Sequence, residues 1–287
     1  MLTRTHPSKL ASSLASRPMV VAAILVLCIT VTIAITAPWI APHKPDQINL
    51  RARLQAPTAL GGAPGHLLGT DALGRDVFSR VLYGARVSVT VGFSVVLVSG
   101  VFGSLIGLMA GYFRGWFDRV LSRIMDIQLA FPTIVLAIAI IAVLGPGLVN
   151  LVVVLAIASW VDYARVIRGE TLSVRERDFV EGARALGAPH VVILLRHVLP
   201  NAIAPTIVIA TFSIASTIIA EASLSFLGLG VPPRIPSWGA MLAEGRENLG
   251  NAWWLGTVPG VAIAIVVLSI NVVGDWLRDF MDPRVQR

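Results

Sequence analysis

Long runs without charged residues alternate with shorter polar intervals along this chain. Asp, Glu, Lys and Arg are absent from residues 19–37, 87–113, 127–161, 201–220 and 255–274. A helix needs about 20 apolar residues to cross a membrane. The third run exceeds one crossing and contains Gly145, Pro146 and Gly147, so we expect two spans joined by a tight external turn, the first of them kinked at Pro132. The pattern predicts an all-α, polytopic membrane protein with six transmembrane helices.

The first apolar run follows a basic segment that contains Arg4, Lys9 and Arg17 and no acid. This start resembles a secretory signal peptide, but the run is longer than a typical signal core, so we expect a retained span with a cytoplasmic N-terminus. The expected divisions are a cytoplasmic tail (1–18), a first transmembrane helix (19–41), an extracytoplasmic loop with an interfacial helix (42–86), a core domain of five transmembrane helices with a cytoplasmic loop at about 168–200 (87–277), and a cytoplasmic C-terminal tail (278–287).

Composition supports the membrane assignment and narrows the partners. The 287 residues are 55% hydrophobic and 14% charged, which lies far from the balance of soluble domains. The net charge of +7 does not indicate nucleic-acid binding, because most basic residues flank the apolar runs on the side expected to be cytoplasmic. Cys28 is the single cysteine, so neither a disulfide framework nor a thiol metal site is expected.

The polar stretch at 178–201 is predicted to form two short helices joined by a bend. Asp178 is placed to cap a first helix together with Glu181, and Gly187 is placed to end it. Pro189 suits the first turn of a second helix, which we expect to end at Pro200. The first helix would display Ala183 and Gly187 on one face, where small side chains let another protein approach, so the stretch is predicted to be a docking element.

A second patterned segment lies between residues 66 and 86. Asp71 and Arg75 are four residues apart, as are Asp76 and Arg80, which is the spacing of ion pairs on a helix. Apolar residues could form the opposite stripe, namely Leu73, Val77, Phe78, Val81 and Leu82. We therefore expect a helix along the membrane surface, with its charged pairs either merely exposed or engaged in gating or delivery.

Polar and small residues within the spans leave several alternatives open. Gly103, Gly107 and Gly111 form a ridge at four-residue spacing, suited either to packing within the chain or to a subunit contact. The acids at the predicted span ends are interpreted as interfacial anchors or, alternatively, as part of a substrate path: Asp126, Asp162, Glu221 and Asp275. The interval after Glu221 is expected outside, in part as a re-entrant loop.

Several kinds of chemistry find no support in the sequence. Neither Lys9 nor Lys44 follows a glycine, so the chain has no phosphate-binding loop of the G-x-x-x-x-G-K-[ST] type and is not predicted to be an enzyme. The five histidines show no metal-ligand spacing, and no metal site is assigned. An intramembrane hydrolase lacks a clear histidine base within the spans. An ion-coupled secondary transporter stays the different-class alternative, although neither repeats nor mid-span ionisable residues indicate one.

Two motifs carry a resemblance to a known family. The first comprises Glu181, Gly182, Ala183, Gly187, His197, Leu199 and Pro200, and it resembles the E-A-A, G, L-P pattern of the coupling loop in permease subunits of bacterial ABC importers. The second comprises Gly69, Thr70, Asp71, Gly74, Arg75, Asp76, Arg80, Gly84 and Arg86, and it resembles the G-T-D to G-A-R stretch of the second permease of peptide importers. Gly182 departs from the usual alanine, whereas His197 is typical of the dipeptide, oligopeptide and nickel branch.

The resemblance implies a type I ABC importer permease that carries peptides across the cytoplasmic membrane, with nickel or another small solute as the alternative. It also implies a set of partners: a homologous second permease, two cytoplasmic ABC ATPase subunits, an extracytoplasmic substrate-binding protein and membrane lipid. ATP and Mg would be used by the ATPases, and this chain would bind no cofactor. The coupling loop at 168–200 would transmit their movement.

Overall fold

The structure is a computed structural model that describes residues 17–62, 64–232 and 234–281. The tails predicted at 1–18 and 278–287 therefore fall largely outside the described residues. The main helices are α2 (Pro18–Ile40), α3 (Val77–Phe113), α4 (Gly115–Leu129), α5 (Thr133–Leu144), α6 (Leu148–Val174), α7 (Asp178–Ala185), α8 (His190–Val192), α9 (Leu199–Phe226), α10 (Trp238–Arg246) and α11 (Trp254–Met281). Short turns η1 (Leu50–Ala52) and η2 (Thr58–Leu60) and the π-helical η3 (Ile193–Val198) complete the list. The predicted all-α fold is confirmed, and no strand occurs among the described residues.

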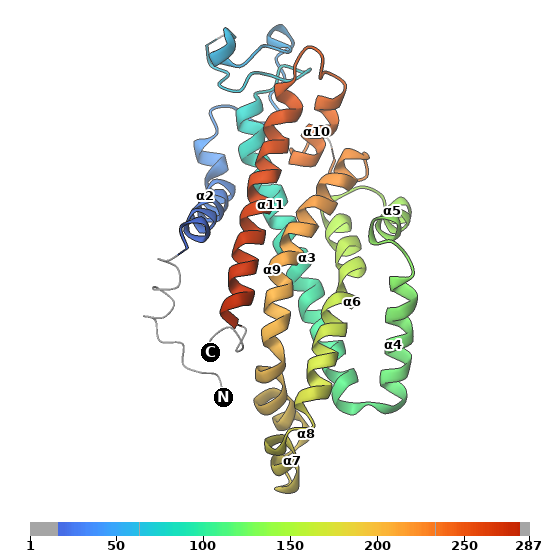
Figure 1. The fold of residues 1–287 in the computed structure, drawn as a ribbon. Helices are drawn as coiled ribbons and strands as arrows, with labels where there is room; N and C mark the ends of the chain where they lie inside the picture. The colour runs from blue at the N-terminus through green and yellow to red at the C-terminus, as the bar shows by residue number, and fades with distance from the viewer. Residues whose placement is uncertain (1–16, 63, 233, 282–287) are drawn as a thin grey trace.

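The long helices form a bundle with two distinct ends (Figure 1). α7 and α8 project at one end, which we call the α7 end. The loop between α2 and α3 lies at the opposite end together with α10, and we call this the loop end. Apolar side chains such as Leu25, Ile29 and Leu268 are exposed on the outside of the bundle. This pattern is typical of helices that face lipid.

Five helices are long and apolar enough to cross a membrane, namely α2, α3, α6, α11 and the continuous stretch His190–Phe226. The third predicted span is instead a bent pair, because α4 and α5 meet at 91°. Pro132 lies in the break between them, and the expected kink is a complete interruption. A proline cannot donate a backbone hydrogen bond and disfavours helix at the residue before it, so α4 ends before Pro132 and α5 begins after it. The polar link at 114–123 is helical from Gly115 onward, as part of α4.

Arg17 and Asp279 place the start of α2 beside the end of α11. Arg17 Nη1 lies 2.9 Å from Asp279 Oδ2. Both ends of the described chain therefore lie on the same side of the bundle. An even number of crossings is needed to return the chain to its starting side, so α4 and α5 together act as one crossing in this topology, which agrees with the six predicted spans.

The ridge of Gly103, Gly107 and Gly111 lies against α6. A side-chain carbon added at these positions would come within 2.3, 2.2 and 2.8 Å of the backbone oxygens of Trp160, Ala164 and Arg168, respectively. The two helices thus approach backbone to backbone over three successive turns. This contact places the ridge inside the chain, which leaves it no room for another subunit.

Candidate functional sites at the two ends of the bundle

The helix start at Asp178 differs from the predicted capping box. Asp178 is the first residue of α7, and the capping position belongs to Arg177, whose side chain makes no capping hydrogen bond. Asp178 and Glu181 both lie in the first turn, where carboxylates favour the positive end of the helix dipole. The acids therefore support the helix electrostatically and not through the predicted cap.

Gly187 closes α7, whose last residue is Ala185, as the sequence indicated. Gly187 has φ +78, its N–H donates to the carbonyl of Arg184 at 3.0 Å, and the N–H of Ala188 donates to the carbonyl of Ala183 at 3.1 Å. These two bonds are the Schellman arrangement that closes a helix at a left-handed glycine. An added side chain at Gly187 would meet no atom within 4 Å, so the site is sterically open and constrained only by its backbone.

The second helix of this stretch does not end at Pro200. α8, η3 and α9 follow one another without a break, and Leu199 and Pro200 open α9. A proline ring in a regular helix clashes with the carbonyl four residues earlier, here that of Arg196. Arg196 lies within the wider π-helical turn of η3, which relieves this clash. The predicted stop is wrong, and the predicted coupling segment, residues 178–200 and called the coupling segment below, runs directly into a helix long enough to span a membrane.

Packing decides which faces of the coupling segment remain available. Ala183 is buried among Val180, Ile193 and Val198, so it does not join Gly187 on a displayed face as predicted. Glu181, Gly182 and Gly187 are exposed, whereas His197, Leu199 and Pro200 are partly buried. Leu186 at the tip is 90% exposed. The face open to a partner is therefore formed by the tip and the outer side of α7.

Side chains from the spans fix the coupling segment in place. The hydroxyl oxygen of Tyr112, near the end of α3, lies 2.8 Å from Nδ1 of His190. The guanidinium of Arg175, just after α6, donates to the backbone carbonyl of Tyr112 and lies over its ring at 5.9 Å. Arg168 of α6 contacts Asp118 of α4 through two hydrogen bonds of 2.5 and 2.9 Å. The contact between Tyr112 and His190 thus ties the segment to α3, and the pair of Arg168 and Asp118 joins α6 to α4 beside it.

At the loop end, residues 66–86 do not form the predicted interfacial helix. Asp71 Oδ1 accepts hydrogen bonds from the backbone N–H groups of Leu73 and Arg75 at 2.8 and 2.9 Å, and Gly74 has φ +72. Local bonds of this kind hold the backbone in a turn and compete with a helix. The helix begins only at Val77, where Asp76 caps α3 by accepting from the N–H of Ser79 at 2.8 Å.

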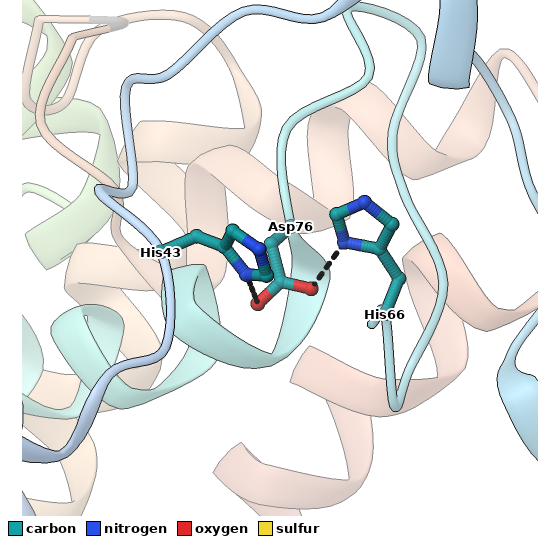
Figure 2. A group of neighbouring side chains, drawn as sticks. All are labelled: His43, His66 and Asp76. Atoms are coloured by element: carbon teal, nitrogen blue, oxygen red, sulfur yellow. Dashed lines mark hydrogen bonds and ion pairs between the residues drawn. The ribbon is translucent and has the colours of Figure 1, made fainter. Parts of the chain in front are cut away.

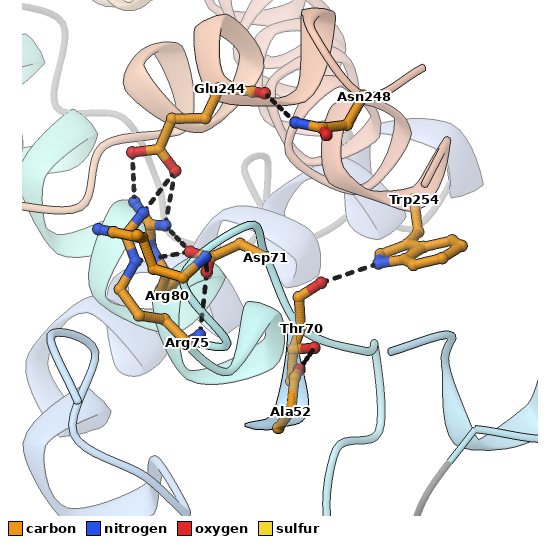
Figure 3. Close-up of polar contacts among 9 residues, drawn as sticks. Ala52, Thr70, Asp71, Arg75, Arg80, Glu244, Asn248 and Trp254 are labelled. Atoms are coloured by element: carbon orange, nitrogen blue, oxygen red, sulfur yellow. Dashed lines mark hydrogen bonds and ion pairs between the residues drawn. The ribbon is translucent and has the colours of Figure 1, made fainter. Parts of the chain in front are cut away.

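The charged residues of this turn form a cluster with α10 (Figure 3). Asp71 accepts from Nε of Arg75 at 2.6 Å and from Nη1 of Arg80, and both arginines reach Glu244 at 2.7 to 3.0 Å. The side chains of Asp71 and Arg80 are only 5% and 2% exposed, respectively. The predicted pair of Asp71 and Arg75 is present but buried in a turn, whereas Arg80 bonds Asp71 and Glu244 and not Asp76. The four residues form one ion cluster with two charges of each sign.

The rest of the second motif builds the turn around this cluster. Gly69 lies against the carbonyl of Gln55 and the indole of Trp254, and Gly84 lies against Trp238. The Trp254 indole donates to the carbonyl of Thr70 at 3.4 Å, and Thr70 is fully buried. Arg86 points outward and is exposed. The motif therefore joins the loop between α2 and α3 to α10 and the start of α11.

Glu221, for which the sequence left an interfacial anchor and a place in the substrate path as alternatives, is enclosed by the helices of the bundle. α9 continues past it to Phe226, and the side chain is fully buried. Ser225 donates to its Oε1 at 2.7 Å and Ser88 of α3 donates to its Oε2 at 3.3 Å. The first part of the predicted re-entrant stretch is thus a continuation of α9, which ends at Phe226. Asp126, by contrast, is exposed and pairs with Arg165 at 2.8 Å.

The loop end also brings together three potential ligands that spacing alone did not reveal (Figure 2). His43, His66 and Asp76 each offer one atom, and these atoms all lie within 4.8 Å of one another. His43 follows α2, His66 lies in the middle of the long loop, and Asp76 caps α3. The 22 residues between the histidines exceed the spacing of a local metal-ligand motif, so the sequence pattern does not indicate this group.

Most of the chain matches two known protein families. Residues 103–287 match the family described as "Binding-protein-dependent transport system inner membrane component". Residues 10–57 match the family described as "N-terminal TM domain of oligopeptide transport permease C". The two matches together include the first span, the coupling segment and every helix from the ridge onward.

Named relatives are similar over nearly the whole length. A putative peptide transport system permease protein of Brucella suis biovar 1 is 46% identical over 263 residues, which cover 92% of this chain and 87% of the relative. The di/tripeptide transport system permease protein DppC of Pseudomonas aeruginosa is 44% identical, with 92% and 87% covered. The glutathione transport system permease protein GsiD of Pectobacterium atrosepticum is 42% identical, with 93% and 87% covered.

Solved structures show the same fold at lower identity. The inward-facing MetNI methionine ABC transporter matches with a TM-score of 0.59 and 20% identity, covering 71% of this chain and 96% of that one. An amino acid ABC transporter crystallised with histidines matches with a TM-score of 0.55 and 18% identity, covering 71% and 94%. These matches support the type I importer permease fold predicted from the sequence.

Proposed function

The chain belongs to the binding-protein-dependent transport system inner membrane component family, and from this premise we propose that it imports short peptides through a membrane pore. ATP hydrolysis by separate ATPase subunits would drive this import. It is a multi-pass inner-membrane permease subunit of an ABC importer. The peptide substrate, the coupling contact and the partners are the proposed parts. The resemblance seen in the two sequence motifs is thereby confirmed at the level of the family.

The anchored coupling segment is the observation that carries the proposal. Its tip is exposed at Glu181, Gly187 and Leu186, while its base is held by the contact between Tyr112 and His190. A partner that pushes on the tip would therefore move α3, α6 and α9 together instead of bending a loop. A lever of this kind suits a permease whose spans reorient when ATPase subunits close.

ATP hydrolysis is assigned to those partner subunits. The chain has only two lysines, Lys9 after Ser8 and Lys44 after His43, so it carries no phosphate-binding loop of the lysine type. ATP and Mg would thus be bound by the ATPases, and this subunit would contribute the membrane path without a cofactor. The proposal places the α7 end, together with both termini, in the cytoplasm and the loop end outside.

A second homologous permease and an extracytoplasmic binding protein complete the proposed machine. Five long spans and one bent pair form an open bundle with apolar side chains exposed around it, and these surfaces would face lipid and the second permease. The loop end, with the buried ion cluster beneath it, is the proposed landing surface for the binding protein. Nucleic acid has no place in this arrangement.

The proposed substrate is a di- or tripeptide, because the printed names of the relatives include a di/tripeptide and a glutathione transport permease. Proteoliposomes containing this chain and the subunits encoded beside it, together with the binding protein, should take up a labelled tripeptide only when ATP is enclosed with the ATPases. Unlabelled peptide should compete and nickel should not. Uptake driven by an ion gradient without ATP would contradict the proposal, and competition by nickel alone would favour the alternative solute.

A further inference from the structure

The group formed by His43, His66 and Asp76 lies at the loop end, away from the coupling segment. The Nδ1 atom of His66 lies 2.9 Å from Oδ1 of Asp76, and the Nδ1 atom of His43 lies 3.7 Å from Oδ2. The two imidazole rings lie side by side with their centroids 4.9 Å apart. Figure 2 shows both rings turned toward the same carboxylate.

His43 is the member whose environment is incomplete. Its Nδ1 atom is buried yet has no hydrogen-bond partner among the described residues. His66 is different, because its Nδ1 atom is hydrogen bonded to Asp76. A buried ring nitrogen without a hydrogen-bond partner costs free energy. A metal ion that accepts the lone pair of this nitrogen would remove that cost.

The separations between the potential ligand atoms are close to those of a site for a small cation. Zn–N and Zn–O bonds of about 2.0–2.2 Å at tetrahedral angles place ligand atoms roughly 3.3 Å apart. The observed 2.9 and 3.7 Å, which run to Oδ1 and Oδ2 of Asp76, lie on either side of this value, and one atom from each residue lies within 4.8 Å of the other two.

The surroundings orient the ligands and leave one position open. Ser79 donates its N–H and its hydroxyl to Oδ2 of Asp76 at 2.8 and 2.7 Å, which fixes the carboxylate. The backbone N–H of His43 donates to the same hydroxyl at 3.1 Å. Outer hydrogen bonds of this kind hold metal ligands in other proteins. A cavity of about 130 Å³ adjoins the group and is lined by His43, Gln47, Asn49, His66, Gly74 and Asp76.

We propose that His43, His66 and Asp76 bind one first-row transition-metal ion, such as Zn²⁺ or Ni²⁺, through two imidazole nitrogens and one carboxylate oxygen. This ligand set suits such ions better than Ca²⁺ or Mg²⁺, which prefer oxygen. The cavity supplies room for water as the fourth ligand. The ion would tie the end of α2 and the middle of the loop to the capping residue of α3.

Metal titration of the purified full-length chain tests the proposal. The protein is prepared without a histidine tag and stripped with chelator, and Zn²⁺ and Ni²⁺ binding is measured by calorimetry, with Mg²⁺ as the comparison. One equivalent of Zn²⁺ should bind, and His43→Gln or His66→Gln should each weaken it by about tenfold or more. His190→Gln removes an imidazole at the α7 end and should leave binding unchanged.

The two histidine variants keep the test decisive. His66→Gln removes a hydrogen bond to Asp76 and so could disturb the loop, whereas His43→Gln leaves that bond in place. Co²⁺ provides a second readout, because a tetrahedral site gives visible absorption bands that should disappear in His43→Gln. Absence of stoichiometric binding by the unmodified chain, or equal affinity in His43→Gln, would overturn the proposal and leave the group as a hydrogen-bonded clip of the loop.

Discussion

The hydroxyl of Tyr112, near the end of α3, shares a 2.8 Å hydrogen bond with Nδ1 of His190 in the coupling segment. The two residues are 78 positions apart in sequence. Their rings also meet edge to face, with centroids 5.7 Å apart. This contact is a direct physical link between the exposed α7 end and a helix that spans the bundle.

Removal of the Tyr112 hydroxyl should loosen the coupling segment without affecting the spans. Tyr112→Phe removes one hydrogen bond worth about 0.5–1.5 kcal/mol but keeps the ring. Amide exchange in residues 186–198, followed by mass spectrometry, should therefore accelerate up to about tenfold. Uptake should fall while membrane abundance stays normal. Tyr83→Phe, in the same helix, is the matched control, and equal exchange in both variants would refute the link.

Substitutions at Gly187 should separate backbone strain from bulk. Gly187→Leu puts a branched side chain at φ +78, which costs about 1 kcal/mol, and adds volume to the proposed docking face. Gly187→Asn tolerates the left-handed backbone much better. We expect the Gly187→Leu variant to lose ATP-driven uptake and copurification of the ATPase. The Gly187→Asn variant should retain part of both. Full activity of the Leu variant at normal abundance would show that this tip does not couple.

The exposed acid of α7 should contribute more modestly. Glu181 lies in the first turn, where its charge favours the helix by about 0.3–1 kcal/mol. Glu181→Gln should therefore reduce copurification of the ATPase only partly, with normal insertion. Glu176→Gln, at an exposed acid just before α7, serves as the control. An effect as large as that of Gly187→Leu would indicate a direct ion pair with the partner.

Members of the ion cluster should differ in their importance for stability. Asp71 is buried and bonds both arginines and two backbone N–H groups, whereas the side chain of Glu244 is 33% exposed. Loss of one partner of a buried pair costs about 3–5 kcal/mol. Asp71→Asn should thus lower the midpoint temperature of unfolding in detergent much more than Glu244→Gln does. Water can reach the partly exposed Glu244 and can partly replace the hydrogen bonds lost in that variant. Equal unfolding midpoints in the two variants would show that burial of the side chain does not determine how much stability its loss removes.

Cysteine labelling checks the proposed orientation. In a Cys28→Ala background, Leu186→Cys at the α7 end and Leu60→Cys at the loop end present exposed thiols, because the native side chains are 90% and 57% exposed. A membrane-impermeant reagent should label Leu60→Cys in intact cells and Leu186→Cys only after the membrane is opened. The reverse pattern would invert the topology and remove the coupling segment from the side where ATP is available.

The sequence by itself determined the properties that depend on neighbours along the chain. Charge-free runs fix where helices can cross a membrane, since burial in lipid depends on each helix's own side chains. Gly187 ends α7 because only its own backbone must adopt the left-handed conformation. The two family motifs were also readable, because they are short strings of residues. Pro132 marked the break between α4 and α5, although not its 91° angle.

Only the tertiary structure decided which residues meet across the bundle. Arg80 binds Asp71 and Glu244, and Glu244 is 164 residues away in sequence. Arg80 does not bind Asp76, which lies at helical spacing, because Asp76 caps α3. Pro200 continues a helix because a π-helical turn precedes it. His43, His66 and Asp76 converge through the closure of a long loop. Such contacts depend on distances in space, and the order of residues along the chain carries no direct record of them.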